Sequence, residues 1–162
     1  MRRDEGLIRP STVFAISLLA FPGILAAQSS TYCDHPVEAC ATFSTFLDAL
    51  NRRDWRGFQA TLDDSISVIV DAPDLSERRD GRAAAEEVFR RIFPVNPPAP
   101  GDLPPPVQPE GLRVQDYGTV VIISFHIHSP GRLGRRTIVL HRASQGWRVI
   151  HIHGSSQPLP PP

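Results

Sequence analysis

The sequence predicts an α+β domain in which a strongly bent antiparallel sheet is covered on one face by three helices and can enclose a pocket. Apolar residues recur at helical spacing in the first half of the chain, whereas the second half consists mostly of short runs rich in valine and isoleucine. A proline-rich segment, residues 94–109, separates the two halves and fits neither pattern.

Length and charge limit the class of protein. The 162 residues suit one domain. Seventeen arginines, with no lysine, balance 17 acidic residues, so the formal net charge is zero. Because no surplus of positive charge is available to displace counterions from phosphates, we expect no nucleic-acid partner.

The first 27 residues predict a signal peptide. Arginines open this segment, an apolar run follows over residues 13–21, and small residues end at Ala27, before Gln28. The apolar run is too short to cross about 30 Å of hydrocarbon with margin. We therefore expect export to the periplasm or the medium without a stable membrane anchor, and an uncleaved anchor is the alternative.

The two cysteines, Cys33 and Cys40, are expected to pair, because an exported chain meets an oxidising compartment. Seven residues apart on one helix, their Cα atoms would be about 10 Å apart, which is too far for a disulfide. A bridge therefore requires Cys33 to lie in the lead-in, residues 28–36, and to fold back near the helix start at Pro36. Two free thiols are the alternative.

Three helices are expected before the proline-rich segment. The first follows Pro36, the second is capped by Asp54, and the third covers residues 83–93 and ends at Pro94. The apolar positions of the first two helices are Phe43, Phe46, Leu47, Leu50, Trp55, Phe58 and Leu62. Between the second and third helices, the β-branched run over residues 65–71 predicts a buried strand.

Four strands are expected in the second half, over residues 112–117, 119–128, 135–142 and 147–153, joined as a meander. Residues 94–109 hold eight of the 17 prolines, which indicates a solvated loop, with a proline-rich recognition segment as the alternative. Residues 157–162 predict a disordered tail.

Four stretches, taken in order, resemble the SnoaL-like members of the nuclear transport factor 2-like superfamily. Residues 46–55 (FLDALNRRDW) resemble that family's opening pair of helices, and residues 80–84 (DGRAA) its glycine-led third helix. Residues 135–140 (RRTIVL) resemble the penultimate strand, and residues 146–155 (GWRVIHIHGS) the closing strand. The likeness covers residues 37–156, with the proline-rich segment as an insertion.

This resemblance implies a cone-shaped α+β barrel that is often a homodimer through the outer face of its sheet. It also implies a pocket of the kind that serves isomerases, cyclases, dehydratases and hydrolases, and binding proteins that perform no chemistry. The insertion over residues 94–109 departs from the family pattern and would form a lid over the pocket mouth or an outer loop.

Histidines on the predicted strands offer acid–base chemistry. A spacing of two places His126 with His128 on one face, and His151 with His153 on one face. Imidazole titrates near neutral pH, so His151 and His153 are candidate general bases. The alternative is that they are hydrogen-bonded wall residues of the sheet.

Other candidate residues complete this hypothetical site. Arg135 and Thr137 share a face, which the final hairpin would place beside the closing histidines, and a guanidinium there would bind an anionic oxygen. Asp71, which ends the first strand, is the candidate carboxylate to orient a histidine or act as a base. Further candidate ligand contacts are Tyr117, Trp55 and His128.

A metal site is the third interpretation of the histidines, because two His-x-His pairs on neighbouring strands can supply imidazole ligands. Cupins use this pattern, but they place a glutamate a few residues later, where this chain has residues 129–132 (SPGR). We therefore expect no metal and no cofactor.

Three functions remain open. The chain is expected to be an exported pocket protein that binds a small, largely apolar ligand with a polar or anionic end. The first alternative is an isomerase, cyclase or dehydratase that uses a histidine as general base. The second alternative is a domain for homodimerisation or protein contact.

Overall fold

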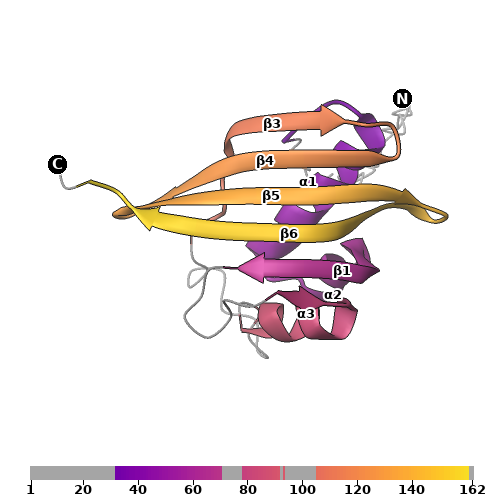
Figure 1. The fold of residues 1–162 in the computed structure, drawn as a ribbon, viewed down its shortest axis with the longest axis horizontal. Helices are drawn as coiled ribbons and strands as arrows, with labels where there is room; N and C mark the ends of the chain where they lie inside the picture. Colours follow the sequence, from indigo (N-terminus) through magenta and orange to yellow (C-terminus); the bar gives the residue numbers. More distant parts are fainter. Residues whose placement is uncertain (1–31, 71–77, 92, 94–104, 161–162) are drawn as a thin grey trace, which may run out of the picture.

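The sheet is built mainly by the second half of the chain, and the helices come from the first half (Figure 1). The computed structural model describes residues 32–70, 78–91, 93 and 105–160. The elements of these residues are α1 (Val37–Arg52), α2 (Trp55–Thr61), β1 (Leu62–Val70), β2 (Arg79–Asp80), α3 (Arg82–Arg90), β3 (Glu110–Asp116), β4 (Val120–Ser129), β5 (Arg132–Ala143) and β6 (Gly146–Pro158). The strands of this described part form one six-stranded sheet in the order β2-β1-β6-β5-β4-β3.

The expected α+β architecture is confirmed, with one correction to the strand directions. Strands β3, β4, β5 and β6 form the predicted antiparallel meander. Strand β1, however, runs parallel to β6, with Ser67 opposite His151. No hairpin joins β1 to β6, so no short turn forces them to be antiparallel. The sheet is therefore mixed.

The helices lie against one face of this sheet, which we call the inner face (Figure 1). Helix α1 ends at Arg52, and the residue that caps it, Arg53, adopts a left-handed conformation with φ of 57°. The predicted cap is confirmed, because the Asp54 side chain accepts a hydrogen bond from the Gly57 amide at 3.0 Å. Leu62, which we assigned to the second helix, instead begins β1, since α2 stops at Thr61.

Aromatic side chains join the three helices. The Phe58 ring centroid lies 4.8 Å from that of Phe89, 4.9 Å from that of Phe93 and 5.0 Å from that of Phe46. Trp55 stacks on Phe58 at 6.1 Å and meets Phe93 edge-on at 5.2 Å. Aromatic pairs at such separations stabilise a fold by more than the burial of their apolar area alone. This cluster therefore holds the helices beside the sheet.

The predicted disulfide between Cys33 and Cys40 is present. The two Cα atoms are 5.4 Å apart, because Cys33 precedes α1 and folds back on its first turn. The same lead-in places the Tyr32 ring 6.1 Å from the Phe43 ring, in an edge-on contact. The lead-in is thus fixed to α1 both covalently and by packing.

Both ends of the second half of the chain are held by contacts with other parts of the domain. The Asn51 side chain accepts a hydrogen bond from the Val107 amide at 2.7 Å and donates one to the Val107 carbonyl at 3.2 Å. At the other end, β6 continues five residues beyond the predicted limit of residue 153, and Pro158 lies opposite Arg132. Residues 1–27 and 94–104, which carry the expected signal peptide and most of the insertion, lie outside the described residues.

One extra residue in β6 changes which side chains face the helices. Leu140 of β5 lies opposite Val149, whereas the preceding residue, Val139, lies opposite His151. Ile150 is therefore the additional residue of a β-bulge. Val149 and Ile152 are both buried on the inner face, although their spacing of three would place them on opposite faces of a regular strand.

Candidate functional site

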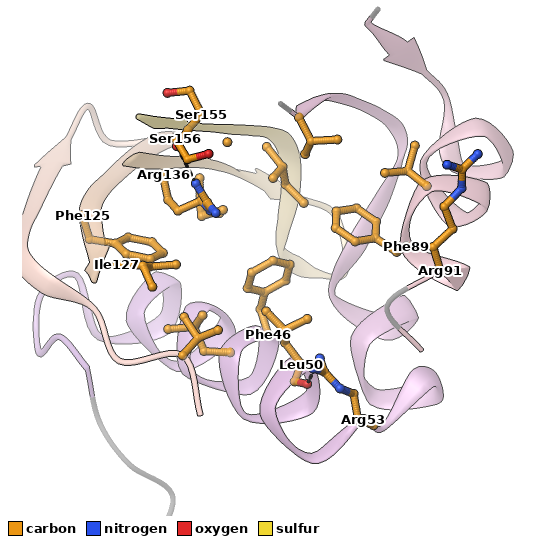
Figure 2. Close-up of a pocket in the computed structure, with 17 residues that line it drawn as sticks. Phe46, Leu50, Arg53, Phe89, Arg91, Phe125, Ile127, Arg136, Ser155 and Ser156 are labelled. Carbon is orange, nitrogen blue, oxygen red and sulfur yellow. Dashed lines mark hydrogen bonds between the residues drawn. The ribbon is translucent and has the colours of Figure 1, made fainter. Parts of the chain in front are cut away.

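A cavity of about 530 Å³ lies between the inner face of the sheet and helices α1 and α3 (Figure 2). Its lining is mostly apolar: Phe46, Leu47, Leu50, Val70, Val88, Phe89, Val107, Phe125, Ile127, Ile138 and Ile152. The remaining lining residues of the described chain are Arg53, Arg91, Arg136, Gly154, Ser155 and Ser156. A concave, apolar cavity with a few polar groups has the composition of a small-molecule site.

The polar lining groups carry positive charge. Figure 2 shows Arg136 together with Ser155 and Ser156 at one side of the cavity, while Arg53 and Arg91 lie at other positions on its margin. Among the described lining residues, none is an aspartate, a glutamate or a histidine. The charged side chains of the described lining are therefore the guanidinium groups of Arg53, Arg91 and Arg136.

Arg136 comes from the middle of the sheet. Its Nη1 donates hydrogen bonds to the carbonyl oxygens of Arg135 and Ser155, both at 2.8 Å. Arg136 lies directly opposite Gly154 in the β5–β6 register, so its side chain extends over a residue without a Cβ. The guanidinium is held by backbone carbonyls on the face that lines the cavity.

Arg53 and Arg91 are held differently. Arg53 follows α1, and its Nη1 donates to the carbonyl of Leu50 at 3.0 Å, which leaves it beside the last turn of that helix. Arg91 follows α3 and is exposed. Neither belongs to the sheet.

The histidines and arginine predicted for the site lie on the opposite face of the sheet. The β5–β6 register pairs Thr137 with His153 and Arg135 with Ser155, so the predicted grouping of these residues on one face is present. That face is the outer one, because the buried inner positions are Ile138 and Ile152. His151, His153, Arg135 and Thr137 therefore do not line the cavity.

The bulge explains this difference. Simple alternation over residues 147–153 predicts Val149, His151 and His153 on one face, but the extra residue Ile150 separates Val149 from the two histidines.

The position of Arg136 on the inner face follows, by contrast, from regular alternation along β5. Arg136 lies on the same face of β5 as Ile138 and Leu140, which are both buried on the inner face. Because Val139 between them is also apolar, however, the sequence does not show which of the two alternating sets of side chains faces the core.

His151 makes a polar contact on the outer face. Its Nδ1 lies 2.7 Å from the Ser67 hydroxyl of β1, across the parallel pairing. Burial, and next the charge of nearby His153, lower the pKa of His151 below its usual 6.5. The neutral imidazole is thus favoured, which agrees with a wall residue that shares a hydrogen bond.

A second imidazole contact lies near the start of β1. His141 Nε2 is 2.8 Å from Asp63 Oδ2, and the Ser65 hydroxyl donates to Asp63 Oδ1 at 2.6 Å. The Ser65 hydrogen bond, opposed by burial and assisted by His141, lowers the pKa of Asp63 to about 2. This group joins β1 to β5 and is remote from the cavity lining.

The other predicted site residues are dispersed. Trp55 belongs to the aromatic cluster, with the Arg90 guanidinium 5.0 Å from its ring centroid. Tyr117 is 62% exposed, and His128 lies 3.7 Å from Glu110 at an exposed position. Asp71 lies outside the described residues, directly after Val70, which lines the cavity.

The described residues contain no group of three or more histidine, cysteine, aspartate or glutamate side chains that could hold a metal ion. The two His-x-His pairs, on β4 and on β6, do not converge because β5 lies between these two strands in the sheet. Within the same residues, no helix is long and apolar enough to cross a membrane.

Solved structures with the same fold are nuclear transport factor 2-like proteins. A protein of that type from Pseudomonas putida KT2440 has a TM-score of 0.57 and 21% identity, with 71% of this chain and 81% of that chain covered. A candidate ketosteroid isomerase from Shewanella frigidimarina NCIMB 400 has a TM-score of 0.56 and 14% identity, covering 74% of this chain and 96% of that one. At these identities, the likeness establishes the fold alone.

A third structure is a candidate association domain of calcium/calmodulin-dependent protein kinase type II from Thiobacillus denitrificans, with a TM-score of 0.55 and 24% identity over 74% of this chain and 94% of that chain. The family model of the SnoaL-like domain matches residues 40–160, so this chain belongs to the SnoaL-like family. No curated protein matches the sequence.

Proposed function

We propose that this chain is an exported pocket protein that binds a small, mainly apolar molecule with a polar or anionic end. The cavity of about 530 Å³ carries the proposal, since eleven of its 17 described lining residues are apolar. The arginines of the lining supply positive charge for the polar end. Export is supported by the disulfide between Cys33 and Cys40, a bond typical of oxidising compartments.

Binding is favoured over catalysis by the chemistry of the lining. General acid–base catalysis needs a titratable group within hydrogen-bond reach of the reacting atom. The described lining residues offer arginine and serine, but no carboxylate and no imidazole. These groups orient a ligand and supply no general base near neutral pH.

The test compares two substitutions of equal size on the two faces of β4. Ile127 lines the cavity, whereas Ile122 lies opposite Val139 on the outer face. Ile127→Trp should fill cavity volume and weaken binding of 1-anilinonaphthalene-8-sulfonate, an apolar anion, by about 10-fold or more, a loss of roughly 1.4 kcal/mol. Ile122→Trp should leave affinity unchanged, and equal affinities for both variants would contradict the proposal.

An enzyme of isomerase, cyclase or dehydratase type is the second candidate. It is supported by the fold likeness to the candidate ketosteroid isomerase. In this alternative His151 or His153 is the general base, and Asp71 is the candidate carboxylate that orients a histidine or acts as a base. For any turnover detected, Asp71→Asn should abolish it, and unchanged rates in His151→Ala and His153→Ala would remove the histidines.

Self-association is the third candidate. It is supported by the fold likeness to the kinase association domain and by outer-face side chains that are only half-buried in a single copy, Ile69, Ile122 and Val139. We propose a homodimer through this face. Analytical ultracentrifugation at micromolar concentration should give twice the monomer mass, and Val139→Glu should reduce it to the monomer.

A further inference from the structure

Arg136 differs from the other two arginines of the cavity in how its side chain is held. Arg53 and Arg91 follow the ends of helices, whereas Arg136 projects from β5, between β4 and β6 in the sheet. Its Nη1 donates to the carbonyl oxygens of Arg135 and Ser155, which belong to adjacent strands. Two bonds to rigid backbone set the plane of the guanidinium and reduce the entropy it would lose on binding a ligand.

Two glycines make room for this side chain. A Cβ on Gly134 would lie 3.2 Å from Arg136 Nη1 and 3.3 Å from Nη2, and a Cβ on Gly154 would lie 3.4 Å from Nε. Contacts of 3.2 Å are closer than ordinary van der Waals distance, so a larger residue would displace the guanidinium. Gly134 and Gly154 are both buried, and neither has a positive φ, so space rather than backbone conformation explains them.

Polar groups gather beside Arg136 and apolar groups lie beyond it. Ser156 lines the cavity at its side, and its hydroxyl accepts a hydrogen bond from Arg132 at 2.7 Å. Ser155 contributes its carbonyl, which accepts from Arg136, while its side chain lies on the outer face with Arg135. Phe125 and Ile127 lie next to Arg136 in the cavity (Figure 2). The cavity is therefore amphipathic, with a cationic, hydroxyl-bearing end at β5 and β6 and an apolar body over α1 and α3.

From this arrangement, and building on the proposed function, we infer that Arg136 is the specificity-determining residue for a carboxylate head group. The cavity would then take apolar carboxylic acids, with the carboxylate at Arg136 and Ser156 and the hydrocarbon against the lining of α1 and α3. A guanidinium matches a carboxylate in charge and in planar geometry. In apolar surroundings their attraction is stronger than in water.

The experiment uses the full-length chain, purified with its disulfide intact, and three probes that share a hydrocarbon chain: decanoate, 1-decanol and methyl decanoate. Dissociation constants are measured by calorimetry at pH 8, where the acid is ionised. The wild-type protein should bind decanoate at least about 10-fold more tightly than the two neutral probes, because a charge-assisted hydrogen bond contributes roughly 1.5–3 kcal/mol. Equal affinity for the three probes would overturn the inference.

Matched variants then locate the preference. Arg136→Gln should weaken decanoate binding by about 10- to 100-fold and leave 1-decanol within about threefold. Arg135→Gln and Arg148→Gln remove the same charge from the outer face of β5 and β6, outside the lining, and should keep the preference for decanoate. Loss of the preference in either control, or its retention in Arg136→Gln, would show that the head group lies elsewhere.

Two further variants cover the case in which Arg136→Gln does not fold. Arg136→Lys keeps the charge but loses the planar, bidentate guanidinium, and Gly134→Ala crowds that guanidinium; both should reduce the preference for decanoate over 1-decanol. Failure of all three probes to bind the wild-type protein would contradict the proposed function itself. Binding of the neutral probes without a preference for decanoate would leave that function standing and refute only the role of Arg136.

Discussion

Asp63 is the charged side chain whose environment changes most clearly on folding. Its carboxylate accepts hydrogen bonds from the Ser65 amide at 2.9 Å and the Ser65 hydroxyl at 2.6 Å, and it lies 2.8 Å from His141 Nε2. These contacts lower its pKa from 3.8 to about 2, with the Ser65 hydroxyl as the largest cause. A carboxyl group with a lower pKa in the folded state stabilises the fold above pH 3.8, and this contribution is lost as the pH falls toward 2.

Replacing Asp63 should therefore reduce both stability at neutral pH and sensitivity to acid. We expect Asp63→Asn to lower the melting temperature at pH 7 and to flatten its decline between pH 4 and pH 2, measured by circular dichroism. Asp64→Asn is the matched control, because Asp64 is an exposed neighbour that pairs with Arg82. A variant at Asp63 with the wild-type acid slope would show that the carboxylate has no such role.

The lowered pKa of His151 should also make the stability of the fold depend on pH. Burial, and then the charge of His153, lower its pKa in the folded protein, so the unfolded chain takes up a proton first as the pH falls below 6.5. Its stabilising contribution is complete above that pH and is lost below it. The free energy of unfolding, measured by urea titration, should therefore fall less between pH 7.5 and pH 5.5 in His151→Gln than in the wild-type protein.

The exposed His126 supplies the control for this measurement. His126→Gln should show the same difference between the two pH values as the wild-type protein. If His151→Gln also retains that difference, the burial of His151 does not contribute to the pH dependence.

At the scale of elements, the junction between α1 and the end of the insertion depends on Asn51. Its amide side chain bonds both the amide and the carbonyl of Val107, at 2.7 and 3.2 Å, in the manner of a neighbouring strand. Val107 lines the cavity, so Asn51 positions part of the wall. The polar group of one side chain thereby links two segments 56 residues apart in the chain.

Removing this link should loosen the wall without unfolding the domain. We expect Asn51→Ala to cost about 1–3 kcal/mol of unfolding free energy, because the partly buried Val107 amide and carbonyl lose their partners. Amide hydrogen exchange at Val107 should accelerate. Thr45→Ala removes an exposed hydrogen bond from the same helix and should leave exchange at Val107 unchanged.

At the scale of the whole molecule, the disulfide fixes the start of the domain. Cys33 lies in the lead-in and Cys40 in α1, with a separation of seven residues. Closing so short a loop restricts the unfolded chain modestly, by about 2 kcal/mol in a chain-entropy account. The fold should therefore persist without the bond, at reduced stability.

A double variant tests this expectation. Cys33→Ser/Cys40→Ser should retain the circular dichroism spectrum and melt several degrees below the oxidised wild-type protein. A reducing agent should lower the melting temperature of the wild type to that of the variant and should not affect the variant. Unfolding of the variant at 25 °C would show that the disulfide is essential rather than supporting.

Much of the fold follows from local pattern. The cap at Asp54, the apolar stripe of α1 and the four C-terminal strands each depend on residues close in sequence, and each is present. The pairing of Cys33 with Cys40 was expected from export to an oxidising compartment, and the distance argument along one helix required Cys33 to precede α1, as it does. The SnoaL-like motifs supplied the overall order of elements, which the family match bears out.

The lining of the cavity could not be predicted to the same degree. Alternation along β6 correctly grouped His151 with Thr137 and Arg135 but placed them on the wrong side of the sheet relative to the cavity, because Ile150 forms a bulge. Arg136 was hidden by the consecutive apolar residues at positions 138–140. The parallel pairing of β1 with β6 was missed for a related reason, since it joins segments with no turn between them.

The sequence alone determined the kind of elements and their order, because these depend on periodicity, caps and turns within short stretches, and its motifs resemble those of the SnoaL-like family. Only the tertiary structure decided which face of the sheet meets the helices and which side chains surround the cavity. The reason is that one extra residue in β6 leaves local hydrogen bonding and composition almost unchanged, yet it exchanges the faces of the residues that follow. That exchange keeps the histidines out of the cavity, whereas regular alternation along β5 with Ile138 and Leu140 places Arg136 in it.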